Sequence, residues 1–359
     1  MRLADYQKYI AASRYGRYIE ELGRRETWEE TVERYIENVV QGKLEDHDDI
    51  SLLRDSIVNM EVLPSMRCLM TAGPALNRDN VAAFNCSYLP VDHPRAFDET
   101  LYILMCGTGV GFSVERQYIN KLPEVPEELT PVNSTIKVED SKRGWAKAFR
   151  KLVGSLYAGD IPGLDYSAIR PHGARLKTFG GRASGPAPLR ALFEFTIRTF
   201  QGARGRKLTS LECHDLMCKI GESVVSGGVR RSALISLSNL SDDRMRHAKD
   251  GNWRVEAPHR QLANNSVAYT EKPDFASFLR EWTTLYHSYS GERGIFFRNA
   301  ADRQVRRTGR RETGRDWGTN PCSEIILRPY QFCNLTSVVV RPDDDLDSLL
   351  RKVEQATIL

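Results

Sequence analysis

The sequence predicts an α/β fold with a mostly parallel, buried sheet. From Pro64 onward, short apolar or β-branched runs are separated by Gly and Pro and alternate with longer helical patterns. Strands that alternate with helices are typical of parallel sheets. The composition is 41% hydrophobic and 27% charged over 359 residues, which is ordinary for a globular protein with one large domain or two smaller ones. The expected strands are FNCSYLPV, VGFSVE, SALISLS, NNSVAYT, GIFF, SEIIL and NLTSVVV.

The region before this alternation is expected to be helical. Apolar and aromatic residues recur there at three- and four-residue spacings, as in Tyr6, Ile10, Tyr15, Tyr18 and Leu22. We therefore expect a helical segment over 1–62, followed by the α/β part over 63–359. The last stretch, DDDLDSLLRKVEQATIL, is also typical of a helix and carries no stop signal. A natural end remains open, but truncation within a helix is favoured.

Charge and hydropathy exclude several classes of protein. No apolar run is long enough to span a bilayer, and the charged N-terminus lacks the apolar region of a signal peptide. We expect a cytoplasmic protein whose seven cysteines are thiols unless a reaction cycles them. The 51 basic and 47 acidic residues leave a net charge of only +4, which argues for neither a membrane nor a nucleic-acid partner.

Three glycine-rich stretches could form turns or nucleotide-binding segments, and a turn is favoured for the first. MCGTGVGFSVE follows a helical pattern and enters a strand, which is the reverse of the order that holds a dinucleotide pyrophosphate. LKTFGGRASGP and VSGGVRRSALISL combine paired glycines with Arg and Ser. Such backbone could approach a phosphate closely, but turn formation explains these two stretches equally well.

The stretch LECHDLMCKIGE raises the possibility of a metal site. Cys213, His214 and Cys218 lie at spacings that suit one helix, and no second pair of ligands lies nearby. Packing within a helix is therefore favoured, and no metal is expected.

The stretch NPCSEI carries a different signal. If it is a strand, alternation places Asn320, Cys322 and Glu324 on one face. Pro321 requires an edge, a strand start or an irregular entry, which is where a site would lie. An amide, a thiol and a carboxylate together on an inward face are seldom structural, because each unpaired buried polar group costs about 1–3 kcal/mol. A functional site is therefore predicted here.

Together these residues resemble the catalytic subunit of ribonucleotide reductases. The motifs are NPCSEI followed by FCNLTSV, and the earlier FNCSYLPVD. The resemblance runs from LPSMRCLMTAGP to the C-terminus. It is closest to the adenosylcobalamin-dependent (class II) ribonucleoside-triphosphate reductases, through VEDSKRGW, IRPHGARLKTFGGRASGP, GGVRRSALI, LANNSV and the short interval between Cys322 and Cys333.

The resemblance implies roles for five residues. Cys322 matches the cysteine that, as a thiyl radical, takes the 3′ hydrogen atom of the ribose. Glu324 matches the base for the 3′-hydroxyl proton, and Asn320 matches the amide that orients the sugar hydroxyls. Cys86 and Cys333 match the pair that reduces the 2′ position and finishes as a disulfide, which a thiol donor can exchange.

Four further positions are expected to bind nucleotides. Ser65 and Asn85 match substrate-binding positions. RVEAPHRQLANN resembles the loop through which a bound deoxynucleotide effector changes base preference, so Arg260 and Gln261 are candidate readers of the base. A solvated surface loop is a close alternative for the last two.

The resemblance also implies the architecture and the partners. The expected fold is half of a ten-stranded α/β barrel with a central finger loop, preceded by the helical segment. The chain would lack the C-terminal half, which holds much of the substrate phosphate site and the cobalamin face, and would be inactive alone. The implied partners are a ribonucleoside triphosphate, a deoxynucleotide effector, a thioredoxin-like reductant and that missing half, with adenosylcobalamin as cofactor.

Three alternatives stay open. The radical could come from a separate protein subunit in place of adenosylcobalamin. A thiol–disulfide oxidoreductase would use Cys322 and Cys333 without a radical, although it would be expected to carry a Cys-x-x-Cys motif, which is absent. A catalytically silent nucleotide-binding fragment is the third.

Overall fold

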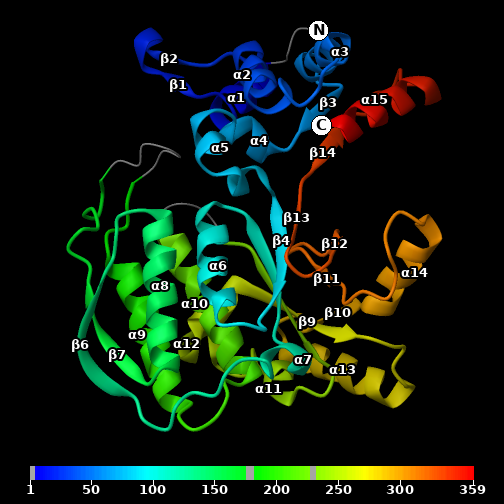
Figure 1. The fold of residues 1–359 in the computed structure, drawn as a ribbon. Helices are drawn as coiled ribbons and strands as arrows, with labels where there is room; N and C mark the ends of the chain where they lie inside the picture. Colours follow the sequence, from blue (N-terminus) through cyan, green and yellow to red (C-terminus); the bar gives the residue numbers. More distant parts are fainter. Residues whose placement is uncertain (1–4, 175–181, 227–231) are drawn as a thin grey trace. The chain divides into compact units, whose positions relative to one another are not determined.

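The computed structural model describes residues 5–174, 182–226 and 232–359. These residues form two compact units, Met1–Asn85 with Asn334–Leu359, and Cys86–Cys333 (Figure 1). The two units divide at 85/86 and 333/334, whereas the expected division at residue 63 stays a prediction. The glycine-rich stretches at 176–186 and 225–237 fall partly outside the described residues.

The first unit is largely helical, as the spacing of its apolar residues predicts. Its helices and strands are α1 (Asp5–Arg14), β1 (Tyr18–Ile19), η1 (Glu20–Leu22), β2 (Arg24–Arg25), α2 (Trp28–Tyr35), the π-helix η2 (Ile36–Val40), α3 (His47–Val58), β3 (Val62–Pro64), α4 (Met66–Thr71), α5 (Pro74–Arg78), η3 (Asn80–Ala83), β14 (Thr336–Val338) and α15 (Leu346–Ile358).

Capping and burial explain where these helices begin and how they pack. Thr27 and Glu30 form a capping box at the start of α2, and Asp345 caps α15. Trp28 lies in the buried core of this unit, and its indole Nε1 donates to the carbonyl of Val58 at 3.0 Å. The core therefore joins α2 to the end of α3.

The second unit contains the predicted parallel sheet. Its strand order is β10-β9-β8-β5-β4-β13, with β4–β5, β5–β8, β8–β9 and β9–β10 parallel and β13 antiparallel to β4. These five parallel strands agree with the expected half-barrel. The strands are β4 (Cys86–Pro90), β5 (Gly109–Ser113), β8 (Leu234–Asn239), β9 (Ala263–Tyr269), β10 (Gly294–Phe297) and β13 (Gln331–Cys333).

Helices and smaller strands surround this sheet. They are α6 (Arg95–Met105), α7 (Arg116–Ile119), β6 (Thr130–Lys137), α8 (Lys142–Tyr157), β7 (Asp160–Asp165), α9 (Ala187–Gly202), α10 (Ser210–Ser226), α11 (Asp243–Arg246), α12 (Trp253–Glu256), η4 (Pro258–Leu262), α13 (Phe275–Ser288), α14 (Arg298–Thr308), β11 (Gly318–Thr319) and β12 (Ile326–Leu327). The strands β6 and β7 pair with each other in parallel, outside the main sheet.

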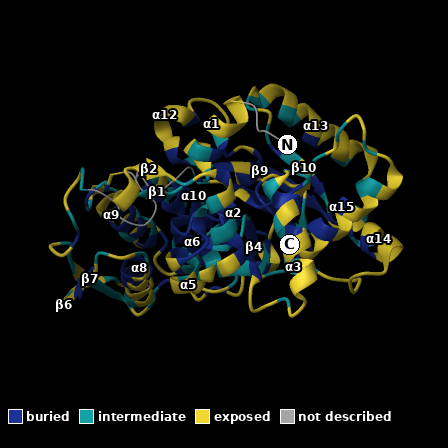
Figure 2. Cartoon of the chain, turned by 90° about the horizontal axis from the view of Figure 1, so that it is seen from above, coloured by how far each residue is buried: buried dark blue, intermediate teal, exposed yellow. Residues whose placement is uncertain are grey.

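The two faces of the main sheet have different neighbours. Helices α6 and α10 contact β5 and β8, whereas β11 contacts β4 and β5 and its side of the sheet packs against α14 (Figure 1). The central strands β4, β5, β8 and β9 are largely buried, while α13 and α14 are largely exposed (Figure 2). The side of the sheet that faces β11 therefore holds the candidate site.

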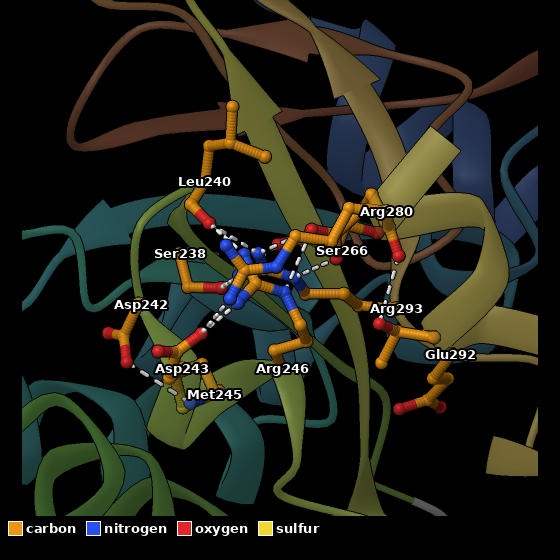
Figure 3. Close-up of polar contacts among 12 residues, drawn as sticks. Ser238, Leu240, Asp242, Asp243, Met245, Arg246, Ser266, Arg280, Glu292 and Arg293 are labelled. Atoms are coloured by element: carbon orange, nitrogen blue, oxygen red, sulfur yellow. Dashed lines mark hydrogen bonds and ion pairs between the residues drawn. The ribbon is translucent and has the colours of Figure 1, made fainter. Parts of the chain in front are cut away.

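Two buried arginines fix the chain at the carboxyl end of β8. Arg293 donates to the Ser238 hydroxyl at 3.0 Å and to the Leu240 carbonyl at 3.0 Å, and Arg246 also donates to that carbonyl (Figure 3). Glu281 pairs with both guanidinium groups, at 2.6 Å from Arg293 and 3.1 Å from Arg246. A buried charged cluster of this kind holds α11, α13 and β10 against β8.

No helix among the described residues is long and apolar enough to cross a membrane. Each of the seven runs expected to be strands overlaps one, and GIFF coincides with β10. In SEIIL, however, only the last two residues are extended, as β12. The reason lies in how the preceding residues turn.

Candidate thiol site

Cys86 and Cys333 face each other across two neighbouring strands. Cys86 begins β4, Cys333 ends β13, and the two are direct partners in the antiparallel register. Directly opposed residues in such a pair have Cα atoms about 4.5–5.5 Å apart. That range lies within the Cα separations of disulfides, about 4.4–6.8 Å. The two thiols are therefore placed to form a disulfide with little movement of the backbone.

The surroundings of this pair keep the Cys333 thiol protonated. Both residues are buried, with exposed fractions of 9% for Cys86 and 8% for Cys333. The hydrogen bond between the two thiols, and then burial, raise the pKa of Cys333 far above its usual range. Proton-bearing thiols suit a pair that delivers two electrons with two hydrogens.

Cys322 lies at the tip of a hairpin formed by residues 318–327, which we call the finger hairpin. Its two short strands, β11 and β12, pair antiparallel. Between them the chain turns, with a positive φ of 63° at Ser323. Burial, then the charge of Glu324 and the nearby Cys86, raise the pKa of the exposed Cys322 thiol. Pro321, next to Cys322, lies against Gly109, which is the register partner of Cys86 in β4, so the tip of the hairpin lies near the cysteine pair.

The expectation of a strand through NPCSEI is wrong. Residues 320–325 form turns and bends, and Asn320 is fully buried whereas Cys322 and Glu324 are exposed. Strand alternation therefore does not place the three on one face. Pro321 starts the turn, and the irregular loop implied by the reductase resemblance is what the structure contains.

Asn320 holds the turn of the finger hairpin together. Its backbone N–H donates to the Ile325 carbonyl at 3.2 Å, and its side-chain Oδ1 accepts from the Ile325 N–H at 3.1 Å. The buried Nδ2 has no hydrogen-bond partner among the described residues. An unpaired buried amide is costly, so this N–H group is available to a polar ligand.

Glycines in β5 give the finger hairpin its place on the sheet. A Cβ at Gly111 would lie 1.8 Å from the Thr319 carbonyl oxygen, and a Cβ at Gly109 would lie 2.9 Å from Pro321. Both distances are shorter than real Cβ contacts, so only glycine admits the hairpin backbone here. These glycines belong to MCGTGVGFSVE, for which the sequence predicts a tight turn that enters a strand but not the contact with the hairpin.

Other residues that build the site gave no signal in the sequence. Tyr88 packs against Gly318, where a Cβ would lie 2.0 Å from the ring. Glu115 and Arg298 form a buried ion pair at 2.7 Å beside the start of the hairpin. Glu115 and Arg298 are 183 residues apart, and no sequence pattern links them. Their burial in the folded chain is the feature that identifies them as part of the site.

Ser65 and Asn85 belong to the first unit. The buried Ser65 caps α4, and its hydroxyl accepts from the Cys68 N–H at 3.1 Å. Asn85 directly precedes Cys86 in the sequence, and its Oδ1 is buried without a hydrogen-bond partner among the described residues. A substrate-binding role for these two residues stays a prediction.

The contacts of Arg260 differ from those of a free reader of bases. Its guanidinium pairs with both oxygens of Asp215, at 2.8 and 2.7 Å, and donates to the Ala248 carbonyl at 2.7 Å. The neighbouring Gln261 is exposed. Arg260 therefore has a structural role within this chain, and the predicted effector role rests more on Gln261.

The cysteines outside the site are buried. Cys213, His214 and Cys218 lie in α10, and the His214 ring contacts Asn265 Oδ1 at 2.9 Å. Burial raises the pKa of Cys213 and Cys218 far above the usual range. Cys68 and Cys106 are buried too.

The sequence resembles curated reductases over most of its length. Residues 120–197 match the family model for the insertion domain of B12-dependent ribonucleotide reductase. The adenosylcobalamin-dependent ribonucleoside-triphosphate reductase of Lactobacillus leichmannii is 28% identical over 90% of this chain. The one of Lacticaseibacillus paracasei is 30% identical over 90%. The chain spans 53% of the length of either relative.

The fold is also similar to that of a solved reductase. A crystal structure of a B12-dependent (class II) ribonucleotide reductase superposes with a TM-score of 0.80 at 24% identity, covering 98% of this chain and 59% of that one. The insertion-domain match covers β6, β7, α8 and most of α9, which lie outside the main sheet. The chain is similar to the adenosylcobalamin-dependent ribonucleoside-triphosphate reductases and spans about half of the length of these relatives.

Proposed function

We propose that this chain supplies the thiol chemistry of a ribonucleoside-triphosphate reductase, which reduces ribonucleotides to deoxyribonucleotides for DNA synthesis. The observation that carries the proposal is the placement of three cysteines. Cys86 and Cys333 are register partners in the sheet, and Cys322 lies at the tip of a hairpin seated on the same face. One thiol is thus separate and exposed, while two are paired and buried.

The separate thiol suits the role of a hydrogen-atom carrier. As a thiyl radical, Cys322 would take the 3′ hydrogen atom of the ribose and return it at the end of the cycle. Glu324, two residues away and exposed, would accept the 3′-hydroxyl proton. The unpaired Nδ2 of Asn320 would donate to a sugar hydroxyl.

The paired thiols suit the reducing step. Cys86 and Cys333 together supply two electrons and two hydrogens, the 2′-hydroxyl leaves as water, and the sulfur atoms join as a disulfide. The opposed register permits that bond without rearrangement of β4 and β13. A dithiol donor such as a thioredoxin-like protein would then reduce it by exchange.

Adenosylcobalamin is the proposed radical source, in line with the names of the relatives. When bound, it supplies the radical that protein side chains do not generate by themselves. The exposed Cys322 thiol is the group of this chain that would meet it. Turnover that required a second metalloprotein subunit in place of the cofactor would contradict this assignment.

The remaining partners follow from the same proposal. The substrate would be a ribonucleoside triphosphate, with a deoxynucleotide effector that selects the base and with the part of the reductase that this chain does not span. The seven cysteines are free thiols in the structure, which suits the reducing conditions of the cytoplasm.

Oxidation of this chain tests the redox pair directly. The reduced chain, treated with a mild thiol oxidant and digested, should yield one major disulfide, between the peptides of Cys86 and Cys333. Cys333→Ser should abolish that product, whereas the control Cys213→Ser should leave it unchanged. A major disulfide that instead joins Cys322 to Cys333 would contradict the assigned pairing.

Base release separates the radical thiol from the reducing pair in an enzyme completed with the missing part. Cys322→Ser should abolish all turnover, because an O–H bond is stronger than an S–H bond and cannot carry the hydrogen atom reversibly. Cys333→Ser or Cys86→Ser should permit 3′ abstraction but stop reduction, so labelled nucleotide would lose its base. Equal base release from Cys322→Ser and Cys333→Ser would refute the role of Cys322.

A further inference from the structure

The finger hairpin is attached to the sheet at its start by a buried ion pair. Arg298 donates to both carboxylate oxygens of Glu115, at 3.1 and 2.7 Å. The side chains are 7% and 0% exposed. Ser113 also donates to Glu115 at 2.8 Å, so the carboxylate is fixed from the strand side. Buried bidentate pairs of this kind set orientation as well as energy.

The third nitrogen of the same guanidinium holds the hairpin. Arg298 Nε donates to the Trp317 carbonyl at 2.7 Å, directly before β11. It also lies 3.3 Å from Asp316, whose carboxylate accepts from the Tyr118 hydroxyl. Trp317 is fully buried. The planar fork of Arg298 therefore joins Glu115 and the hairpin backbone in one rigid geometry.

The ion pair crosses the face of the sheet on which the hairpin lies. Glu115 follows β5 and Arg298 follows β10, and these strands are three steps apart in the sheet. Three steps correspond to roughly 14 Å along a flat sheet. The two long side chains bridge that interval by direct contact. Neither residue contacts a thiol, so any effect on Cys322 acts through the hairpin.

The remaining part of the hairpin has few polar links to the sheet. The hydrogen bonds of Asn320 with Ile325 lie within the hairpin itself. Gly109 and Gly111 provide space for the hairpin but no side-chain hydrogen bond. On the side of β12, Arg311 donates to the Ile326 carbonyl at 2.8 Å. The Arg298 contacts at the start of the hairpin and its close packing on Gly109 and Gly111 are what join it to β5.

We propose that Arg298 and Glu115 are a positioning pair that sets the finger hairpin on β5 and thereby holds Cys322 beside Cys86. The functional meaning of that placement rests on the proposed reductase activity, but the placement itself can be tested without turnover. In this view Arg298 acts at the start of the hairpin, and Cys322, five residues beyond Trp317, moves with it.

Hydrogen exchange of this chain provides the first test. Arg298→Lys keeps the positive charge but loses the fork, and Glu115→Gln keeps the size but loses the charge. Both variants should exchange amides of 317–327 faster by about tenfold or more, whereas β8 and β9 stay close to wild type. Arg307→Lys, an exposed arginine on the same helix, is the matched control and should change neither region.

The reactivity of Cys322 provides a second readout that a merely structural role would not change. Burial, Glu324 and Cys86 raise the pKa of this thiol. Displacement of the hairpin would remove it from Cys86 and from its partial burial, so the pKa should fall towards the usual value. The pH profile of Cys322 alkylation, followed by peptide mass, should therefore shift to lower pH in both variants and not in Arg307→Lys.

The outcomes are distinct. Uniformly faster exchange across the second unit, or failure of both variants to fold, would overturn the proposal, because the pair would then support the whole unit and not the hairpin. Unchanged exchange at 317–327 with an unchanged Cys322 profile would also overturn it. Failure of the reductase assignment would instead appear in disulfide mapping and base release, with the exchange result intact.

Discussion

Replacement of Gly111 by alanine tests the contact between β5 and the finger hairpin with a single methyl group. Gly111 lies in β5, and its backbone φ is outside the left-handed region, so alanine suits the local conformation. The obstacle is the hairpin, because the new Cβ would lie 1.8 Å from the Thr319 carbonyl oxygen. The substitution therefore acts on one contact of the candidate site and not on strand geometry.

The size of the displacement follows from that contact. Real Cβ atoms essentially never come within 3.0 Å of another heavy atom, so Thr319 must move by at least 1.2 Å relative to β5. Insertion of a methyl group into a packed region typically costs about 1–3 kcal/mol. Because Thr319 is three residues from Cys322, a shift of about 1 Å at the tip could lower turnover of a completed enzyme about 10²-fold.

Two measurements on this chain check the expectation. Urea unfolding followed by circular dichroism should give a lower free energy of unfolding by about 1–3 kcal/mol. Alkylation of Cys322 at fixed pH should also become faster, because the tip is released from the sheet. The control is Gly154→Ala in α8, where no atom lies within 4 Å of the new Cβ and a gain of about 0.4–1 kcal/mol is expected.

One result would refute the reasoning. If Gly111→Ala had wild-type stability and a wild-type rate of Cys322 alkylation, the Thr319 carbonyl could not lie where the structure places it. A stability loss without any change in Cys322 reactivity would show that the hairpin adapts locally and does not move its tip.

Three further outcomes are expected. Gly318→Ala should lower the urea midpoint, because its Cβ would lie 2.0 Å from the Tyr88 ring. The same substitution in a Tyr88→Ala background should cost less stability. Additive losses of unfolding free energy from the two substitutions would contradict the contact. The pKa of Cys333 is raised by its hydrogen bond with the Cys86 thiol and by burial, so Cys333 should resist alkylation at pH 8. Rapid labelling of Cys333 at that pH would contradict this expectation. Burial alone would raise the pKa of Glu281, but hydrogen bonds and charges from Arg293 and Arg246 lower it overall. The stability that ionised Glu281 contributes should therefore be lost as pH falls below about 4.3. Glu281→Gln should flatten that part of the profile of unfolding free energy against pH.

The parallel sheet could be predicted because its strands depend mostly on local composition. Buried parallel strands form continuous apolar or β-branched runs, and GIFF at 294–297 becomes β10 with the expected bounds. The fold class and the architecture of the second unit agree with the class II reductase structure. Residues 130–137 and 160–165, which form β6 and β7, carry a mixture of polar residues and were not expected as strands.

The finger hairpin could not be predicted in detail, because the rest of the fold decides its conformation. Strands of two residues are too short for periodicity to register, and the buried Asn320 beside the exposed Cys322 does not follow strand alternation. The pairing of Cys86 with Cys333 came from resemblance, whereas the ion pair of Glu115 with Arg298 gave no local signal. Likewise, the ion pair of Arg260 with Asp215 depends on how η4 packs on α10, which the sequence does not show.

The direction of the hairpin explains why the site needs it. Ligands of open parallel sheets usually bind beyond the carboxyl ends of the strands, but Cys86 lies at the amino end of β4. From Trp317, held near the end of β5, the hairpin runs back along β5 to Pro321 at its start. The tip of the hairpin therefore lies at the amino end of β5, whose Gly109 is the register partner of Cys86, and Cys322 is exposed there. The glycines of β5 permit that path, since any larger residue would occupy the space of the hairpin backbone.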